Sequence, residues 1–244
     1  MRWGIVRFPG SFGAEDFAEA VCPQPASGDV AVFIGHLEAD LPDVEVVVLP
    51  AGMAFDDLPR VGVLAARSPV LSAIRRFADA GGLVVGLGNG FQILCEAGLL
   101  PGRFDENACG GFLARPVRLR VENVANPLVN RGNAADRLWL PMAARHAAWR
   151  GEKGDLESLE RNGRIILRYD PLASGLLGED PIGAEGGVAA LTNHASNVVG
   201  AMVNPEYAAL PRDRAFGLSS DGNILFESLR AWVSLSAGRE SSSR

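Results

Sequence analysis

One short segment has the arrangement of residues that covalent catalysis uses. Residues 86–90 read Gly-Leu-Gly-Asn-Gly and directly follow the apolar run at 83–85, so a strand is predicted to turn tightly into a helix. This is the layout of a nucleophile elbow, glycine–x–nucleophile–x–glycine, in which a reactive side chain occupies the tip of the turn. Here the tip residue is Gly88, which has no side chain. The sequence therefore predicts the frame of such a site without the atom that would attack a substrate.

An elbow of this kind also needs hydrogen-bond donors around its tip. A helix beginning at Asn89 directs free backbone N–H groups and its positive dipole end toward the tip, where an acyl-transfer enzyme stabilises an oxyanion. A second donor is expected from the turn Ala51-Gly52-Met53, just after the apolar run at 46–49. From the glycines alone, a plain flexible strand–helix connection is an equally good interpretation, because short glycine motifs are weak evidence.

Short apolar runs alternate with helical patterns along the chain. The early runs lack polar alternation, which favours strands covered on both faces, as in a parallel sheet. Residues 112–122 largely alternate apolar and polar, which indicates an antiparallel strand with one wet face. Strands are expected at residues 5–6, 30–34, 46–49, 83–87, 112–122, 164–169 and 198–203, helices at 17–21, 68–80, 89–97 and 224–235, and a loop at 170–187. The pattern predicts an α/β fold, with a mostly parallel central sheet, helices on both faces and a small antiparallel addition.

Composition excludes several classes of function. The chain has 244 residues and a net charge of −6, which disfavours nucleic acid and anionic membranes as partners. Its apolar runs are far shorter than the roughly 18 residues of a membrane span. Three cysteines without a close pair favour the cytoplasm, and three histidines leave little for a metal site; no cofactor is expected. We expect one domain at residues 1–236 and a disordered tail at 237–244.

The longer sequence around the elbow resembles that of a known family. Residues 86–102 read Gly-Leu-Gly-Asn-Gly-Phe-Gln-Ile-Leu-Cys-Glu-Ala-Gly-Leu-Leu-Pro-Gly. They are similar to the elbow of the class I glutamine amidotransferases. The similarity is greatest to the glutaminase subunits of phosphoribosylformylglycinamidine synthase, from purine biosynthesis. These subunits have the sequence Gly-Ile-Cys-Asn-Gly-Phe-Gln-Ile-Leu at this position. The resemblance extends from residue 1 to about 232. The further segments that match the family are 6–11, 49–53, 65–70, 121–123 and 221–229.

The resemblance implies both a fold and a binding site. The implied fold is a glutaminase-like (flavodoxin-like) sandwich. The implied substrate-binding positions are Gly52, Met53, Asn89, Gly90 and Gln92. For Gln92, helix capping or packing is an equal alternative.

The departures from the family fall on the chemistry. The family's nucleophilic cysteine corresponds to Gly88, and the histidine of its His-Pro-Glu segment corresponds to Asn204, while Glu206 is retained. Ala51 replaces a glycine of the oxyanion turn, and Ala144-Arg145-His146-Ala147 replaces His-Gly-Glu-Gly. Glycine cannot attack a carboxamide, and an asparagine amide cannot act as a base near neutral pH. The sequence therefore predicts a glutaminase-like subunit that has lost its nucleophile and its base.

Few other residues offer a replacement. Cys95 lies seven positions past the tip, about 10 Å along a helix, and is expected in the core, with structural roles for Cys22 and Cys109. His146 is displaced from the family's histidine position, and a surface or loop role is favoured for His194.

Three hypotheses remain open. In the first, the chain is a non-catalytic subunit that docks on a large synthetase subunit. In the second, it is an active amidotransferase subunit that supplies ammonia to a synthetase by an unrecognised nucleophile. In the third, it is a regulatory module that binds a small glutamine-like ligand in the pocket where the family binds glutamine.

Overall fold

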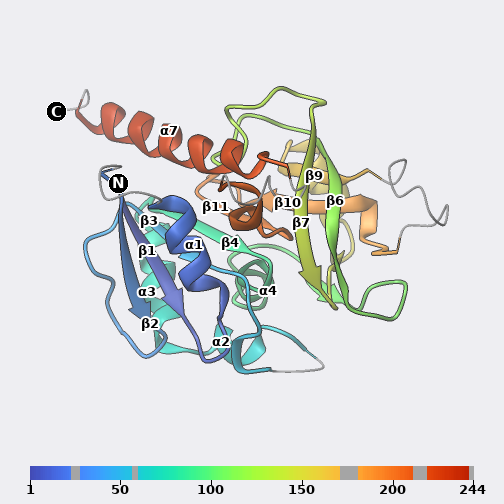
Figure 1. Ribbon diagram of the computed structural model, residues 1–244, viewed down its shortest axis with the longest axis horizontal. Helices are drawn as coiled ribbons and strands as arrows, with labels where there is room; N and C mark the ends of the chain where they lie inside the picture. The colour runs from blue at the N-terminus through green and yellow to red at the C-terminus, as the bar shows by residue number, and fades with distance from the viewer. Residues whose placement is uncertain (23–27, 57–59, 171–180, 211–218, 242–244) are drawn as a thin grey trace.

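A nine-stranded sheet forms the centre of the molecule (Figure 1). The computed structural model describes residues 1–22, 28–56, 60–170, 181–210 and 219–241. The sheet order is β2-β1-β3-β4-β11-β10-β9-β6-β7. The first five strands in this order are parallel: β2 (Val30–Gly35), β1 (Arg2–Arg7), β3 (Val46–Leu49), β4 (Leu83–Leu87) and β11 (Val198–Ala201). The other four continue it in antiparallel fashion: β10 (Val188–Thr192), β9 (Ile165–Tyr169), β6 (Leu113–Val121) and β7 (Arg137–Ala144).

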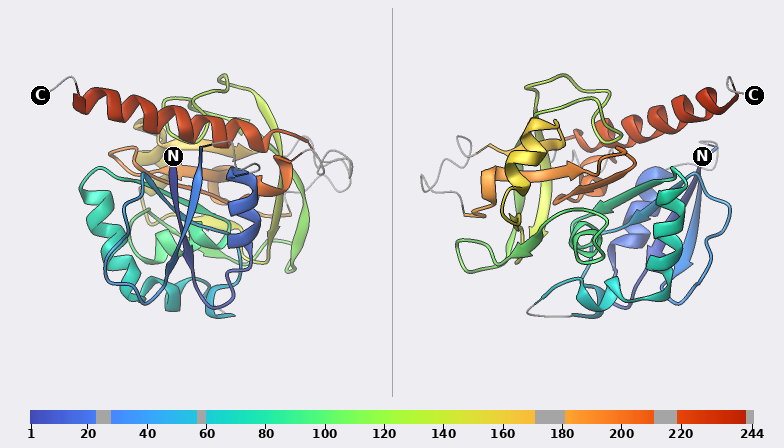
Figure 2. Two further views of the ribbon diagram at one scale, coloured as in Figure 1. Left: turned by 60° about the vertical axis from the view of Figure 1, so that its left-hand side comes forward. Right: turned by 180° about the vertical axis from the view of Figure 1, so that it is seen from behind.

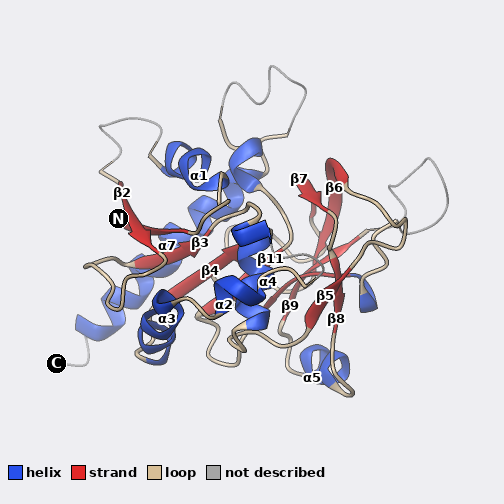
Figure 3. Cartoon of the chain, turned by 90° about the horizontal axis from the view of Figure 1, so that it is seen from below, coloured by secondary structure: helices blue, strands red, loops and turns tan. Residues whose placement is uncertain are grey.

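Helices cover both faces of the parallel part (Figures 2 and 3). On one face lie α1 (Gly13–Val21) and α7 (Gly222–Ser241), joined by an edge contact between the rings of Phe17 and Phe226. The opposite face carries α2 (Val63–Ala66), α3 (Pro69–Asp79) and α4 (Asn89–Glu96). The remaining short elements are α5 (Asp155–Arg161), the two-stranded sheet of β5 (Arg103–Asp105) and β8 (Ala148–Arg150), and the 3-10 turns η2 (Ala54–Asp56), η4 (Glu185–Gly187) and η5 (Pro205–Ala208).

Burial follows the two kinds of strand. Every residue of β3 and β4 is buried, as expected for parallel strands between two helical layers. In β7, Leu138, Leu140 and Met142 are buried while Trp139 is exposed, because only one face of this edge strand packs on the core. The carboxyl ends of the parallel strands β3, β4 and β11 lie together at one edge of the sheet, next to the last residues of β7.

The predicted fold class is confirmed, with differences in detail. The sequence analysis did not predict β5, β7, β8, β10, α2 or α5. The predicted loop at 170–187 lies partly outside the described residues and ends in η4. Helix α7 continues through Ser241, so residues 237–241 are helical where a disordered tail was expected, and 242–244 are not described. No helix in the described chain combines the length and apolar character that crossing a bilayer requires.

Candidate active site

The strand–helix turn after β4 has the backbone geometry of an elbow. Gly88 precedes α4 with φ +52° and ψ −113°, a combination that residues with a Cβ rarely adopt. A Cβ at Gly86 would lie 2.7 Å from the carbonyl oxygen of Gly90, and one at Gly90 would lie 1.9 Å from that of Leu49. Both flanking glycines are therefore required by close backbone approach.

The space at the tip is different. A Cβ placed on Gly88 would lie 3.2 Å from the Ala51 Cβ and 3.9 Å from the Asn204 Nδ2. The structure thus brings together Gly88 and Asn204, the two positions that the sequence identified as replaced. Ala51, the alanine in the oxyanion turn, takes up part of the room that a nucleophilic side chain would need.

Asn204 is held rigidly between β11 and η5. Its backbone N–H donates to the Pro141 carbonyl at 2.8 Å, and its Oδ1 accepts the Ala143 N–H at 3.2 Å. Its Nδ2 donates to Glu206 Oε1 at 3.3 Å. Since a backbone donor meets one end of the amide and a carboxyl oxygen meets the other, the orientation of the amide is fixed by its partners.

Glu206 is a buried carboxyl group with an incomplete set of partners. It is 2% exposed, and its Oε2 has no hydrogen-bond partner within the described chain. Burial, with a smaller contribution from the nearby carboxylate of Asp16, raises the pKa of Glu206 to about 7, although the hydrogen bond from Asn204 acts in the opposite direction. Asp16 itself accepts a hydrogen bond from the Tyr207 hydroxyl at 2.6 Å, which ties η5 to α1.

The turn after β3 lies against the elbow, where the Ala51 Cα is 3.6 Å from the Cβ position of Gly88. Gly52 has φ +152°, and a Cβ there would lie 2.7 Å from the Ser11 Cα, so this position also requires glycine. The Met53 N–H donates to the Gly10 carbonyl at 2.9 Å. By contrast, the N–H groups of Gly52 and Asn89 have no acceptor within the described residues. These two donors are the pair that an oxyanion site would use.

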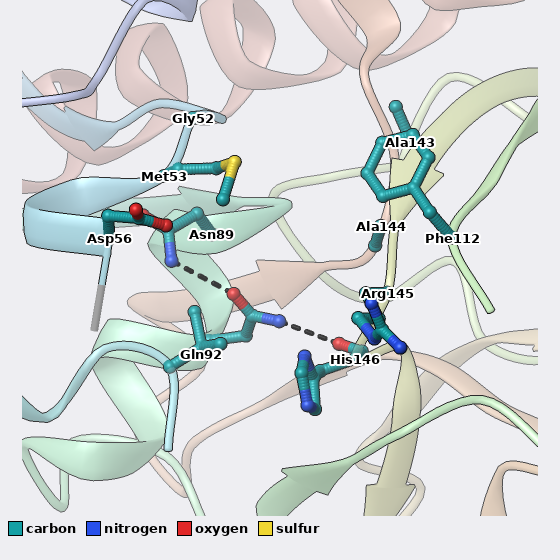
Figure 4. Close-up of a pocket in the computed structure, with 11 residues that line it drawn as sticks. Gly52, Met53, Asp56, Asn89, Gln92, Phe112, Ala143, Ala144, Arg145 and His146 are labelled. Carbon is teal, nitrogen blue, oxygen red and sulfur yellow. Dashed lines mark hydrogen bonds between the residues drawn. The ribbon is translucent and has the colours of Figure 1, made fainter. Parts of the chain in front are cut away.

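A cavity of about 190 Å³ opens beside these donors (Figure 4). Four of the five expected substrate-binding residues, Gly52, Met53, Asn89 and Gln92, line it. Gly90 does not line it and instead packs against Leu49. The other lining residues are Asp56, Val61, Phe112, Ala143, Ala144, Arg145 and His146.

A chain of side-chain amides crosses the cavity wall (Figure 4). Asn89 Oδ1 accepts the Ala54 N–H at 2.9 Å, and its Nδ2 donates to Gln92 Oε1 at 2.9 Å. Gln92 Nε2 then donates to the His146 carbonyl at 2.6 Å. These bonds connect the elbow helix to the end of β7, so Asn89 and Gln92 shape the cavity as well as line it.

Asp56 and Phe112 are among the lining residues that the sequence did not predict as part of the site. Asp56 has φ +49° within η2, and Phe112 is an exposed aromatic residue just before β6. Neither belongs to a motif, and each reaches the cavity only because the fold brings its loop to the elbow. The sequence analysis identified Arg145 and His146 only as part of a segment that differs from the family, and it did not predict that they line the site.

The cysteines lie away from the cavity. Cys95 is buried, its Sγ lies 3.4 Å from the Pro101 carbonyl, and burial raises its pKa well above the ordinary value, so the inert thiol form is favoured. Together with His194 it lines a separate groove at the far end of α4. Cys22 is partly buried with a raised pKa, and Cys109 is exposed beside Gly111. Within the described residues, no group of three histidine, cysteine or acidic side chains is placed to hold a metal ion.

Comparison with known proteins assigns the chain to a family. The model of the CobB/CobQ-like glutamine amidotransferase domain matches residues 1–233. The chain belongs to this family of class I glutamine amidotransferases.

Its relatives narrow the relationship to one subunit type. The chain is 38% identical over 237 residues to phosphoribosylformylglycinamidine synthase subunit PurQ of Salinibacter ruber, covering 97% of this chain and 98% of the relative. It is 40% identical over 209 residues to the PurQ subunit of Rhodopseudomonas palustris strain BisB18, covering 84% and 88%. The structure of PurLQS from Thermotoga maritima aligns with a TM-score of 0.81 at 29% identity, covering 95% of this chain and 98% of that chain. This chain is therefore related to PurQ.

Proposed function

We propose that this chain is a PurQ-like subunit that docks on a synthetase partner and does not hydrolyse glutamine. The observation that carries the proposal is the pair at the elbow. Gly88 occupies the nucleophile position, and the Asn204 amide lies 3.9 Å from where its Cβ would be. A thiol–imidazole pair works because the imidazole takes the thiol proton and later returns it to the leaving amine. Neither glycine nor a carboxamide can perform either step.

The residues around the cavity argue against a substitute nucleophile. None of the described residues that line it carries a thiol, a hydroxyl or an amine. Among the described lining residues, Asp56 and His146 are the only ones with a carboxylate or imidazole that could act as a nucleophile. An active subunit that uses one of them is the second candidate function, and the assay below tests it.

Apolar side chains around the cavity support a docking role. Met53 and Phe112 line the cavity and are exposed, and Trp139 lies on the same face of β7 as the lining residue Ala143. Phe12, 65% exposed, belongs to the loop that packs against Gly52. Exposed large apolar side chains gathered in one region are typical of protein–protein interfaces. We call Phe12, Met53, Phe112 and Trp139 the rim patch.

A glutaminase assay tests the catalytic half of the proposal. Glutamate release would be measured with the chain alone and with a large synthetase subunit of the phosphoribosylformylglycinamidine synthase type, and an intact PurQ subunit would serve as positive control. We expect no release above buffer in either condition. We also expect no covalent adduct by mass spectrometry after exposure to an electrophilic glutamine analogue. Glutamate release, or an adduct on Asp56 or His146, would establish the active alternative.

The docking half has its own experiment. Phe112→Ser is expected to reduce co-purification of the synthetase subunit at least fivefold, because it removes a large, 59% exposed apolar side chain from the rim patch. Leu37→Ser is the matched control, since Leu37 is 71% exposed, follows β2 and does not line the cavity. Equal loss with both variants, or no loss with either, would contradict the assignment of this surface.

A further inference from the structure

A groove at the far end of α4 is separate from the elbow cavity and larger than it. Its volume is about 730 Å³, compared with about 190 Å³ beside the elbow, and the two share no lining residue. Its walls are formed by the loop that follows α4, the turn between β10 and β11, the segment that leads into α5 and the residue that precedes β9. Volumes of about 300–1,000 Å³ are typical of small-molecule sites. This α4 groove therefore has room for a ligand of its own.

Arg164 gives the α4 groove a cation without a paired anion. Its Nε is closed off from solvent and has no hydrogen-bond partner within the described chain. The ion pairs of the described residues do not include Arg164, and Asp155 acts on it only at longer range. Burial lowers the pKa of Arg164, because a partly desolvated cation without a counter-ion is disfavoured. Its terminal nitrogens are not closed off in this way, so they are the atoms left to meet an anion in the groove.

Two further donors line the same groove. Arg103 is about half exposed and lies 3.4 Å from the Asp105 carboxylate, which Arg150 also meets at 3.4 Å. One carboxylate between two guanidinium groups leaves an excess of positive charge. His194 is exposed in the turn between β10 and β11 and offers a ring N–H. Together with Arg164, these side chains supply three donors for an anion.

The acidic residues of the groove are placed so that they do not cancel this preference. Arg60 holds the largely buried Glu96 carboxylate through contacts of 3.0 Å and 2.8 Å, so this pair is internally neutral. Asp155 Oδ2 accepts the Glu152 N–H at 2.8 Å, and both residues lie where the chain enters α5. A carboxylate is an acceptor only, so Glu152 and Asp155 suit the hydroxyl groups of a ligand. The groove thus combines a cationic part with a part that accepts hydrogen bonds.

We propose that the α4 groove binds a small phosphate monoester that carries hydroxyl groups, of the sugar phosphate class. A phosphate monoester has three acceptor oxygens and nearly two negative charges near neutral pH, which match Arg103, Arg164 and His194. Guanidinium groups fit the geometry of phosphate oxygens well. The hydroxyl groups of the sugar donate to Glu152 and Asp155. Because this site is separate from the elbow and from the rim patch, the inference does not depend on the proposed loss of glutaminase activity or on docking.

Calorimetric titration of the full chain in a phosphate-free buffer tests this inference. The probes are ribose 5-phosphate and glucose 6-phosphate, with ribose, glucose and inorganic phosphate for comparison. We expect at least one of the two sugar phosphates to bind at least tenfold more tightly than inorganic phosphate, and the free sugars to show no binding. The reason is that only a sugar phosphate fills both parts of the groove. Binding of neither sugar phosphate, or binding no tighter than that of inorganic phosphate, would overturn the inference.

Three variants test the position of the ligand. Arg164→Gln should weaken sugar phosphate binding at least tenfold, whereas Arg161→Gln, at an exposed arginine of α5 that does not line the groove, should leave it unchanged. Should Arg164→Gln fail to fold, Arg103→Gln removes a more exposed cation and is expected to weaken binding at least fivefold. Glu152→Ala should weaken the sugar phosphate without weakening inorganic phosphate, because it removes only an acceptor for hydroxyl groups. Unchanged binding in the folded arginine variants of the groove would place the ligand elsewhere and overturn the proposed site.

Discussion

The frame of the elbow and its tip differ in how much room each leaves for a side chain. In the frame, a Cβ on Gly86 or Gly90 would collide with backbone carbonyl oxygens, at 2.7 Å and 1.9 Å. At the tip, the nearest atom to a Cβ on Gly88 is the Ala51 Cβ at 3.2 Å. The frame is fixed by the packing of β3, β4 and α4 against one another. The tip is limited only by its positive φ and by a single methyl group.

This difference bears on the proposed loss of the nucleophile, because it shows which elbow positions accept a change of side chain without a change of shape. A nucleophile at the tip carries backbone strain of about 1–3 kcal/mol, and glycine removes that strain. Replacement at the tip therefore need not disturb the fold, whereas replacement in the frame must move a central strand. Losing function at Gly88 is structurally easy, and losing the elbow itself is not.

The largest expected effect comes from breaking the frame. Gly90→Ala would place its Cβ 1.9 Å from the Leu49 carbonyl, and β3 cannot retreat because all of its residues are buried. We expect a loss of about 4 kcal/mol in the free energy of unfolding, or failure to fold. Chemical denaturation measures this, with Gly111→Ala as control because a Cβ there meets nothing within 4 Å. A loss below about 1 kcal/mol would show that the frame is not rigid.

The same contrast explains what could be predicted from the sequence. The continuous apolar runs of β3 and β4 and the glycines between β4 and α4 carry their own signal, so these elements and the elbow were located from local pattern. Strand β7 was missed because Trp139, Pro141 and Ala143 break the alternation. Its Pro141 is tolerated at a sheet edge, where its carbonyl accepts the Asn204 N–H.

The cavity could be predicted only in part. Its elbow side follows from the glycine motif and the family resemblance, which identified Gly52, Met53, Asn89 and Gln92. Its far side is built by Phe112 and residues 143–146, which reach the elbow because β6 and β7 extend the sheet and turn back toward α4. No local pattern encodes that approach, since it depends on the register of strands far apart in sequence.

The buried carboxyl group of Glu206, which contacts Asn204 next to the elbow tip, is expected to make the stability of the protein depend on pH. In the folded chain the pKa of Glu206 is about 7, whereas in an unfolded chain this carboxyl group releases its proton near its ordinary pKa of 4.5. The folded state therefore binds more protons between these values, and this contribution to stability is full below pH 4.5 and is lost as the pH rises through 7. Glu206→Gln should remove this dependence and raise stability at pH 8 by about 2–3 kcal/mol relative to the parent.

Denaturation at pH 4.5, 6 and 8 measures that effect. The difference between parent and Glu206→Gln should be small at pH 4.5 and largest at pH 8. Glu157→Gln, on the exposed face of α5, is the control and should leave the pH dependence of the parent unchanged. A parent stability that rises from pH 4.5 to 8 relative to Glu206→Gln would show that Glu206 is charged in the folded protein.

The smallest expected effect comes from filling the tip. Gly88→Cys places a Cβ at φ +52° and 3.2 Å from the Ala51 methyl, and we expect a loss of about 1–2 kcal/mol in the free energy of unfolding. Part of this loss is contact with Ala51, so Ala51→Gly should relieve it. The double-mutant cycle should give a coupling of about 0.5–1 kcal/mol. Glutamate release should stay at background in both the single and the double variant, because Asn204 cannot take the thiol proton. A cycle without coupling would show that backbone strain alone sets the cost at the tip, and measurable release would show that the retained donors suffice for turnover once a thiol is present.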